Sequence, residues 1–406
     1  MINRITIENF KSLRRVDLSL GSMNLLIGTN ASGKSNFLDA LRVLQGIGDG
    51  FTIGEILDGK PRSATSEVWD GIRGGSTQAC FTGTGDQDEV NLTVSGTLEG
   101  SSRRRWEFGI GFSPAEGRVT RERLKGTKAI YDSDPITINS PSSPIFWVRH
   151  YPGRQGRPPE PSFDSVRPAI GQLADRLTEF SKSHRNLAAD VTEFLASTQR
   201  IDPTPQVLQQ YSSAHRVLRL GDRGENFAAL VRTICEDERA KSGYLSWLQA
   251  LRPDEVDDVG TLSGAVDEPL FMLIERGEKF PAPVLSDGTL RFAAIAAAFF
   301  QRAMPGIMTI EEVENGIHAS RLRLLLELLR SQSKLRGTQV FATTHSPTTL
   351  EWLDRSEYRT TFLCTRDEST GESTIRPLTD VPHFTDVIKK APLSDLFVEG
   401  WLESAP

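Results

Sequence analysis

The sequence lacks the features that define several large classes of protein. Its three cysteines, Cys80, Cys235 and Cys364, are scattered with no CxxC pair, which argues against a disulfide scaffold or a zinc site and fits a reducing compartment. No apolar run reaches the roughly 18 residues that a membrane span needs. The N-terminus has no apolar signal-peptide core. We therefore expect a cytoplasmic protein with no membrane partner.

Charge of either sign is also not in strong excess. The formal net charge is -6, with 25% charged and 38% hydrophobic residues, as in ordinary globular proteins. This balance argues against wholesale coating by nucleic acid and leaves room for a local basic groove. A chain of 406 residues suits one large α/β domain with insertions, or two lobes.

The strongest motif lies near the N-terminus. Residues 28–35 read GTNASGKS and match the phosphate-binding pattern GxxxxGK[ST]. The preceding residues 23–27 are apolar and strand-like, and residues 36–44 have helical spacing. Strand, glycine loop and helix form the context that the motif requires, so we predict a phosphate-binding loop here.

The loop's chemistry follows from its residue types. Gly28 and Gly33 let successive backbone N–H groups point at one anion, and the start of the following helix adds partial positive charge. Lys34 is predicted to reach the β- and γ-phosphates, and Ser35 to ligate Mg²⁺. The predicted nucleotide-binding set is Gly28, Asn30, Ser32, Gly33, Lys34, Ser35 and Asn36.

A second glycine-bearing turn stands at Leu285–Arg291, before the apolar residues 292–300. A small polar turn at a helix start is again an anion site. The phosphate loop already surrounds its own nucleotide, so Ser286 and Gly288 are predicted to contact the nucleotide of another copy of the chain.

Two predicted strands later in the chain are each followed by titratable side chains. Residues 306–310 are followed by Glu311 and Glu312. Since neighbours on a strand cannot share a face, they must differ in role: we assign Glu311 to the Mg²⁺ water and Glu312 to the base or water-positioning role. Residues 339–344 form a strand that ends at His345, which we predict to contact the γ-phosphate.

The order of these parts resembles that of ABC-type ATPases, and within them the RecF/SMC-like group, which also includes the ATPase half of OLD-family proteins. The resemblance rests on Asn9–Leu13, Gly28–Asn36, Leu285–Arg291, Glu311–His318 and Thr343–Pro347. It implies an α/β fold: a P-loop NTPase ABC-type head with an antiparallel β subdomain and an inserted helical lobe.

The resemblance also implies a cofactor pair and an assembly. ATP and Mg²⁺ would lie between two heads of an ATP-dependent homodimer, with residues 315–318 crossing the seam. Two residues depart from the family pattern: Glu311 replaces the usual Asp and Val313 the usual Pro, for which we expect slow turnover. Gln78 is a candidate for the glutamine that links nucleotide to the second lobe, with an ordinary surface glutamine as the alternative.

We expect three parts: an ATP-binding lobe over 1–150, a helical lobe over 151–282 that opens with a linker at 151–161, and a second ATP-binding part over 283–406. Residues 173–180 and 227–234 have helical period. Residues 392–402 are predicted to form a closing helix. Leu396–Gly400 faintly resembles the start of a Toprim nuclease domain, but we expect no nuclease centre in this chain.

The target of the ATPase is left open between double-stranded DNA and an effector or nuclease protein, as in RecF-like repair or anti-phage defence. Basic residues at 103–105 and 118–128 are either a solvated sheet face or a nucleic-acid patch. A nucleotide-gated scaffold with incidental hydrolysis is the alternative function.

Overall fold

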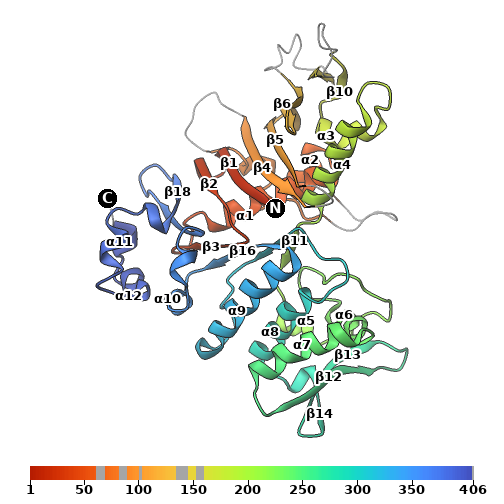
Figure 1. Ribbon diagram of the computed structural model, residues 1–406, viewed down its shortest axis with the longest axis vertical. Coiled ribbons are helices and arrows are strands. Elements are labelled where there is room, and N and C mark those ends of the chain that lie inside the picture. Colours follow the sequence, from red (N-terminus) through yellow and green to blue (C-terminus); the bar gives the residue numbers. More distant parts are fainter. Residues whose placement is uncertain (61–68, 82–88, 100–102, 134–144, 152–159, 405–406) are drawn as a thin grey trace. The chain divides into compact units, whose positions relative to one another are not determined.

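A computed structural model describes residues 1–60, 69–81, 89–99, 103–133, 145–151 and 160–404 (Figure 1). The chain forms two compact units. Unit 1 comprises Met1–Gly21, Leu26–Thr198 and Thr360–Asp380, and unit 2 comprises Ser22–Leu25, Gln199–Arg359 and Val381–Pro406. None of the described helices is both long and apolar enough to cross a bilayer.

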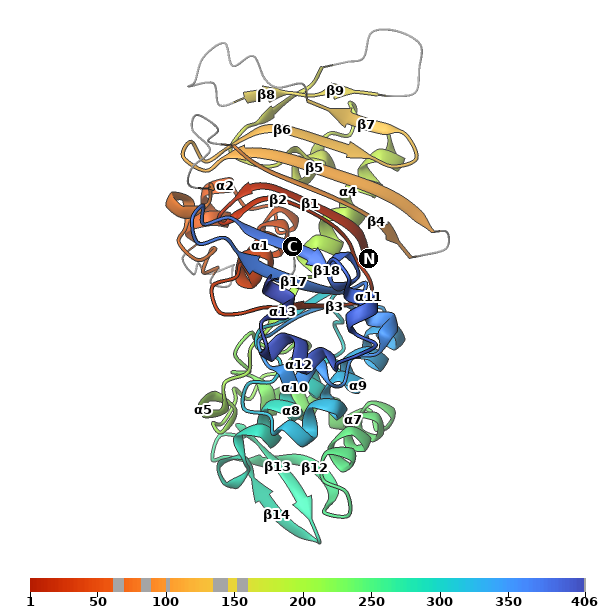
Figure 2. The same ribbon diagram turned by 90° about the vertical axis from the view of Figure 1, so that its left-hand side faces the viewer.

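Unit 1 contains the predicted antiparallel β subdomain. Its main sheet has seven strands in the order β2-β1-β4-β5-β6-β7-β9, and each neighbouring pair is antiparallel (Figure 2). Alternating burial along β1 and β4 gives the sheet one apolar face. The strands are β1 (Ile2–Phe10), β2 (Leu13–Ser19), β4 (Val90–Leu98), β5 (Arg104–Ser113), β6 (Arg118–Lys125), β7 (Ala129–Asp132) and β9 (Arg149–His150).

Helix α1 (Lys34–Gly48) packs against α4 (Lys182–Ala196) within unit 1. A Cβ on Gly48 would lie 2.3 Å from the backbone nitrogen of Ala196, so only glycine permits this approach. The remaining elements of this unit are α2 (Ile53–Asp58), α3 (Ala169–Gln172), the pair β8 (Ile145–Trp147) and β10 (Ser162–Asp164), and the hairpin β17 (Thr361–Arg366) and β18 (Ser373–Pro377).

Unit 2 is built on the parallel strands β11 (Gln199–Ile201), β15 (Ile307–Ile310) and β16 (Gln339–Thr344). The first residues of β3 (Met23–Ile27) lie beside β16, where the Asn24 side-chain amide donates to the Val340 carbonyl at 3.2 Å. Both β15 and β16 are buried throughout, as expected for parallel strands covered by helices.

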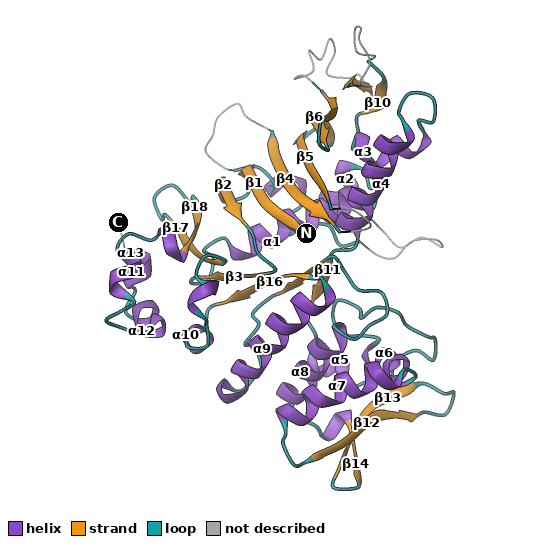
Figure 3. Ribbon diagram, viewed as in Figure 1, coloured by secondary structure: helices purple, strands orange, loops and turns teal. Residues whose placement is uncertain are grey.

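Helices and a three-stranded antiparallel sheet complete the unit: α9 contacts β16, and α6 and α7 contact the three-stranded sheet (Figure 3). The helices are α5 (Pro205–Leu208), α6 (Phe227–Cys235), α7 (Glu238–Leu251), α8 (Asp287–Ala298), α9 (Ala319–Arg336), α10 (Pro347–Leu350), α11 (Phe384–Val387), α12 (Leu393–Val398) and α13 (Trp401–Ser404). The sheet comprises β12 (Val256–Ser263), β13 (Pro269–Glu275) and β14 (Glu278–Pro281).

The middle of the chain differs from the expected helical lobe. Residues 151–282 are divided between the two units and include β12–β14. The helix expected over 227–234 is confirmed as α6, but residues 173–180 form only a single 3-10 turn, because Phe180 instead packs against Tyr131 and His150. The expected linker lies mostly outside the described residues.

The prediction of one continuous helix over 392–402 is also wrong. This segment is divided into α12 and α13. Gly400 lies between them with a φ of 71°, a left-handed conformation that ends α12.

A buried carboxylate joins β6 to the start of α3 in unit 1. Glu122 is 1% exposed and accepts hydrogen bonds from the Tyr131 hydroxyl at 2.5 Å and from the N–H groups of Ala169 and Ile170 at 2.7 Å. Burial raises the pKa of the Glu122 carboxyl to about 7, against the lowering effect of these donors. The Glu122 carboxyl group therefore anchors the start of α3 to strand β6.

We predict that Glu122 makes the stability of unit 1 depend on pH. A carboxyl whose pKa is raised in the folded state stabilises it fully below about pH 4.5, and this contribution is lost as pH rises through about 7. Relative to Glu122→Gln, the wild-type free energy of unfolding should fall by about 3 kcal/mol between pH 5 and pH 8. Urea unfolding of both proteins at the two pH values measures this difference, and a constant gap would contradict it.

Candidate functional site

The predicted phosphate loop lies between β3 and α1, and two glycines are required by close contacts within unit 1. Gly28 has a φ of 151° and Gly33 a φ of 103°. A Cβ on Gly28 would lie 2.3 Å from the Cys364 carbonyl oxygen, and one on Gly33 would lie 2.7 Å from the Ser373 Oγ. Strands β17 and β18 thus approach the loop too closely for any side chain at these positions.

The loop offers donors suited to a phosphate. The N-cap of α1 is Gly33, so no side chain caps this helix, and its first turn has no acidic residue. The Ser32 Oγ is buried without a hydrogen-bond partner among the described residues. Lys34 is also buried, and its Nζ donates to the carbonyls of Gly28 and Thr29 at 2.7 Å each. An orphaned hydroxyl, an uncapped helix start and a lysine fit an anionic ligand.

A serine network that the sequence analysis did not predict supports the loop. Asn36 donates from Nδ2 to the Ser12 Oγ at 2.7 Å, and the Ser373 hydroxyl donates to the same oxygen at 2.7 Å. The Ser373 N–H also donates to the Ser12 carbonyl. Residues 361 positions apart therefore fix Asn36 on the first turn of α1.

A buried ion pair lies one turn further along α1. Lys11, in the turn between β1 and β2, pairs with Asp39 and donates to the Arg73 carbonyl at 2.7 Å. Burial lowers the pKa of the Lys11 ammonium, although Asp39 opposes this shift. The turn at Asn9–Leu13 is thereby joined to α1 by charge as well as by Ser12.

The acidic loop, Glu311–Asn315, follows β15 in unit 2. Glu312 is exposed and has a φ of 45°, a left-handed conformation that costs a non-glycine residue roughly 1 kcal/mol or more and is concentrated at functional sites. Its N–H donates to the Thr343 Oγ1 at 2.9 Å. Glu311 is only 17% exposed in its side chain, so the two glutamates differ in environment.

Glu311 and Val313, the two residues that depart from the family pattern, each make a specific contact in unit 2. The Glu311 Oε1 lies 3.4 Å from the Arg200 Nη2 on β11. The N–H of the buried Val313 donates to the Thr343 carbonyl at 3.0 Å. Proline, the usual residue here, has no N–H and would lose this hydrogen bond.

The signature turn, Leu285–Arg291, begins α8 as predicted. The Ser286 side chain caps the helix by accepting from the Thr289 N–H at 3.2 Å, while Ser286 and Asp287 are exposed. A Cβ on Gly288 would lie 2.6 Å from the Gly316 carbonyl oxygen. Glycine at 288 is therefore required for α8 to pack against the end of the acidic loop.

His345 lies directly after β16 and contacts the same loop. Its Nδ1 is 3.2 Å from the Glu314 Oε1, which also accepts from the His345 backbone N–H at 2.9 Å. Nearby, His318 caps α9 by accepting from the Ser320 N–H at 3.3 Å. Neither Glu314 nor the capping role of His318 was found from the sequence.

The predicted site residues therefore fall into two groups. Gly28, Asn30, Ser32, Gly33, Lys34, Ser35 and Asn36 lie together in unit 1, and Ser286, Gly288, Glu311, Glu312 and His345 are brought together in unit 2. Gln78 is exposed in unit 1, and its nucleotide-linking role remains a prediction.

Comparison with known families matches both groups. Residues 1–51 match the model described as "AAA ATPase domain". Residues 238–351 match "AAA domain, putative AbiEii toxin, Type IV TA system". The first match contains the phosphate loop, and the second contains the signature turn, the acidic loop and His345.

Known proteins resemble the chain over most of its length. A protein of Helicobacter pylori named ATP/GTP phosphatase is 24% identical over 368 residues, which cover 87% of this chain and 88% of that protein. An SMC head bound to the C-winged helix domain of ScpA superposes with a TM-score of 0.50 at 10% identity, covering 92% of this chain and 97% of that one. An SMC head from Thermotoga maritima gives 0.47 at 13% identity, with coverage of 93% and 98%.

The structural match that reaches a TM-score of 0.50 shows the fold, and the two family matches contain the motifs. The chain thus carries two segments that match AAA-type ATPase domains on an α/β fold like that of SMC heads, and it is an ATPase, as its motifs predict.

Proposed function

We propose that ATP joins two copies of this ATPase, that hydrolysis separates them, and that the cycle acts on DNA. The observation that supports association is the signature turn. Ser286 and Asp287 are exposed at the start of the 12-residue helix α8, and the packing of Gly288 on Gly316 fixes the direction of the turn. A rigid, exposed helix start suits a phosphate held by a second copy.

Each site residue has a proposed role. The loop N–H groups and Lys34 hold the phosphates, and His345, oriented by Glu314, donates to the terminal phosphate. Glu312 orients and deprotonates the attacking water. Nucleotide that binds only the associated state stabilises it, so loss of the γ-phosphate releases the second copy.

Mg²⁺ fits the residues present. Hydroxyl and carboxylate oxygens are its preferred ligands, and we propose that Ser35, at the start of α1, and Glu311, directly after β15, would provide them. When bound, the ion neutralises phosphate charge. The Arg200 guanidinium beside the Glu311 carboxylate lowers the negative charge available from that side chain, which accords with slow turnover.

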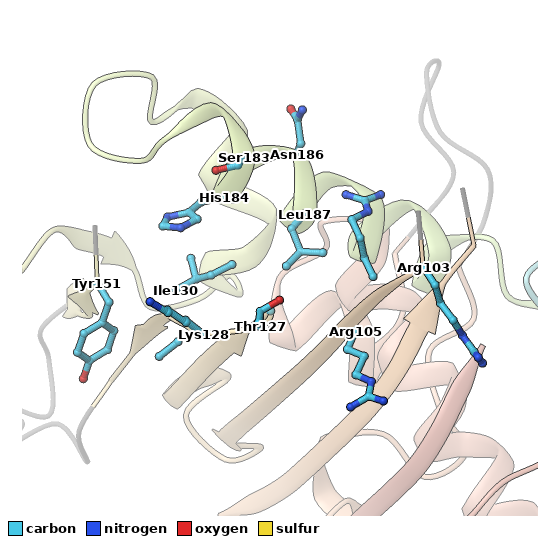
Figure 4. Close-up of a pocket in the computed structure, with 13 residues that line it drawn as sticks. Arg103, Arg105, Thr127, Lys128, Ile130, Tyr151, Ser183, His184, Asn186 and Leu187 are labelled. Atoms are coloured by element: carbon cyan, nitrogen blue, oxygen red, sulfur yellow. The ribbon is translucent and has the colours of Figure 1, made fainter. Parts of the chain in front are cut away.

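A basic groove in unit 1 supports DNA as the target. The groove, of about 1260 Å³, lies between the sheet and α4. Figure 4 shows Ser183, His184 and Asn186 on α4, with Arg103 and Arg105 on the sheet side and Lys128 and Tyr151 further along. From the two basic segments singled out in the sequence, Arg103–Arg105 and Gly126–Lys128 line this groove.

The charges in this groove are only partly compensated. Arg104 pairs with Asp190 at 2.6 Å, and Arg103 lies 3.7 Å from Glu99. Among the described residues, Arg105 and Lys128 have no acidic partner. Uncompensated cations that line a groove suit a phosphate backbone, whose binding releases counterions.

We predict that Gly28→Ala abolishes nucleotide binding, because the added methyl group would collide with the Cys364 carbonyl. The affinity for a fluorescent ATP analogue should fall by at least about tenfold. Gly54→Ala is the matched control, since Gly54 lies in α2 with open space around it. Unchanged affinity in Gly28→Ala would contradict the assigned loop.

We predict that Glu312→Gln traps an ATP-bound dimer, because nucleotide still binds while the water is no longer activated. Size-exclusion chromatography with light scattering should show a dimer with ATP but not with ADP, and phosphate release should nearly stop. Adding Lys34→Ala should restore the monomer. A Glu312→Gln protein that stays monomeric with ATP contradicts the proposal, whereas a wild-type dimer whose phosphate release ignores Glu312 favours the scaffold alternative.

We predict that Arg105→Glu with Lys128→Glu weakens binding to double-stranded DNA by at least about tenfold at low salt and flattens its salt dependence. The control is Arg276→Glu with Lys279→Glu. This pair is exposed in unit 2, so the double variant makes the same change in net charge away from the groove. Fluorescence anisotropy over a salt series measures both. DNA-stimulated ATP hydrolysis would favour a RecF-like repair role, and hydrolysis that ignores DNA would favour a protein effector, as in anti-phage defence.

A further inference from the structure

Arg291 is a buried arginine on the second turn of α8, five residues after Ser286. Its exposed fraction is 3%, and a charged side chain is seldom buried unless it is paired and hydrogen-bonded. The carboxylate beside it, the Oδ1 of Asp202, lies 3.4 Å from Nη1. Its other acceptors are backbone carbonyl oxygens, so the side chain mainly holds the backbone rather than balancing charge.

Those carbonyls belong to two separate segments of unit 2. Nη1 donates to the Pro203 carbonyl at 3.0 Å. Nη2 donates to the carbonyls of Glu311 at 3.0 Å and Glu312 at 3.3 Å. One planar guanidinium therefore joins α8, the segment after β11, and the acidic loop. A lysine ammonium, which is a point charge, cannot span acceptors on both sides.

The same contacts fix the backbone of Glu312 at both ends. Arg291 holds the carbonyl oxygens of Glu311 and Glu312, and the Thr343 Oγ1 accepts from the Glu312 N–H. The left-handed φ of 45° at Glu312 persists only where neighbouring groups impose it. Since φ and ψ set the direction of the Cα–Cβ bond, these contacts fix the starting direction of the Glu312 side chain.

We propose that Arg291 is a positioning residue for the hydrolysis step, which makes the placement of Glu312 depend on the signature helix α8. The proposal rests on the role of Glu312 proposed above. A shift of α8 on binding a second copy's nucleotide at Ser286 is passed by Arg291 to the acidic loop. Hydrolysis is thereby coupled to association without any contact between Arg291 and nucleotide.

The test compares Arg291→Lys with Arg330→Lys in the full chain. Arg330 is the matched control: it lies on α9, also in unit 2, pairs with Glu357 at 2.6 Å and bonds to the Trp352 carbonyl. We expect Arg291→Lys to lower kcat at least about tenfold while the KM for ATP and the affinity for a fluorescent analogue stay within about twofold. Arg330→Lys should alter the melting temperature only.

A second pair of variants covers the case in which Arg291→Lys fails to fold. Thr343→Val removes the acceptor of the Glu312 N–H with little change in volume, and Thr343→Ser keeps it. Thr343→Val should show the same loss of kcat at unchanged KM, and Thr343→Ser should recover most of it.

The outcomes separate the two proposals. If Arg291→Lys and Thr343→Val fold and keep the wild-type kcat while Glu312→Gln loses turnover, the positioning role is overturned. The proposed function is left intact by that result. A parallel rise in KM or loss of nucleotide binding in Arg291→Lys overturns the positioning role as well. Full turnover in Glu312→Gln refutes the role of Glu312, and the positioning role falls with it.

Discussion

The phosphate loop depends on the close approach of a hairpin that is distant in sequence. Strands β17 and β18 place the Cys364 carbonyl and the Ser373 side chain within 2.3 and 2.7 Å of where a Cβ would stand on Gly28 and Gly33. The loop is therefore held by close contact with this hairpin, and its N–H groups keep the directions that an anion requires. The Ser12 and Asn36 contacts extend the same restraint to α1.

In unit 2, side-chain contacts hold the acidic loop in place. This loop is held from three sides: by Arg291, by Thr343 and by the pairing of Glu314 with His345. These contacts come from α8 and from the end of β16, so the loop's shape reflects how both elements pack beside β15. A carboxylate held in this way is already oriented before the reaction, which is where much of an enzyme's rate enhancement arises.

Local patterns predicted the elements that carry the motifs. The strand, glycine loop and helix around Lys34, the capped turn at Ser286, and the strands that end at Glu311 and His345 were all visible in the sequence, because apolar runs and helix starts depend on near neighbours. Contacts between distant residues were not visible. Nothing in the local pattern marks Arg291 in the signature turn, or Glu122 among the basic residues 118–128, as buried, yet both are. Residues 173–180 show the same limit, since tertiary packing of Phe180 overrides a helical period.

The hydrogen bond from Val313 to Thr343 makes opening of the acidic loop measurable by hydrogen exchange. The Val313 N–H is donated to the Thr343 carbonyl, the residue whose side chain accepts from Glu312. An amide proton at this position exchanges with solvent only when the loop opens. A proline at this position would have no such proton, whereas in this chain the exchange rate of the Val313 amide records how often the acidic loop leaves β16.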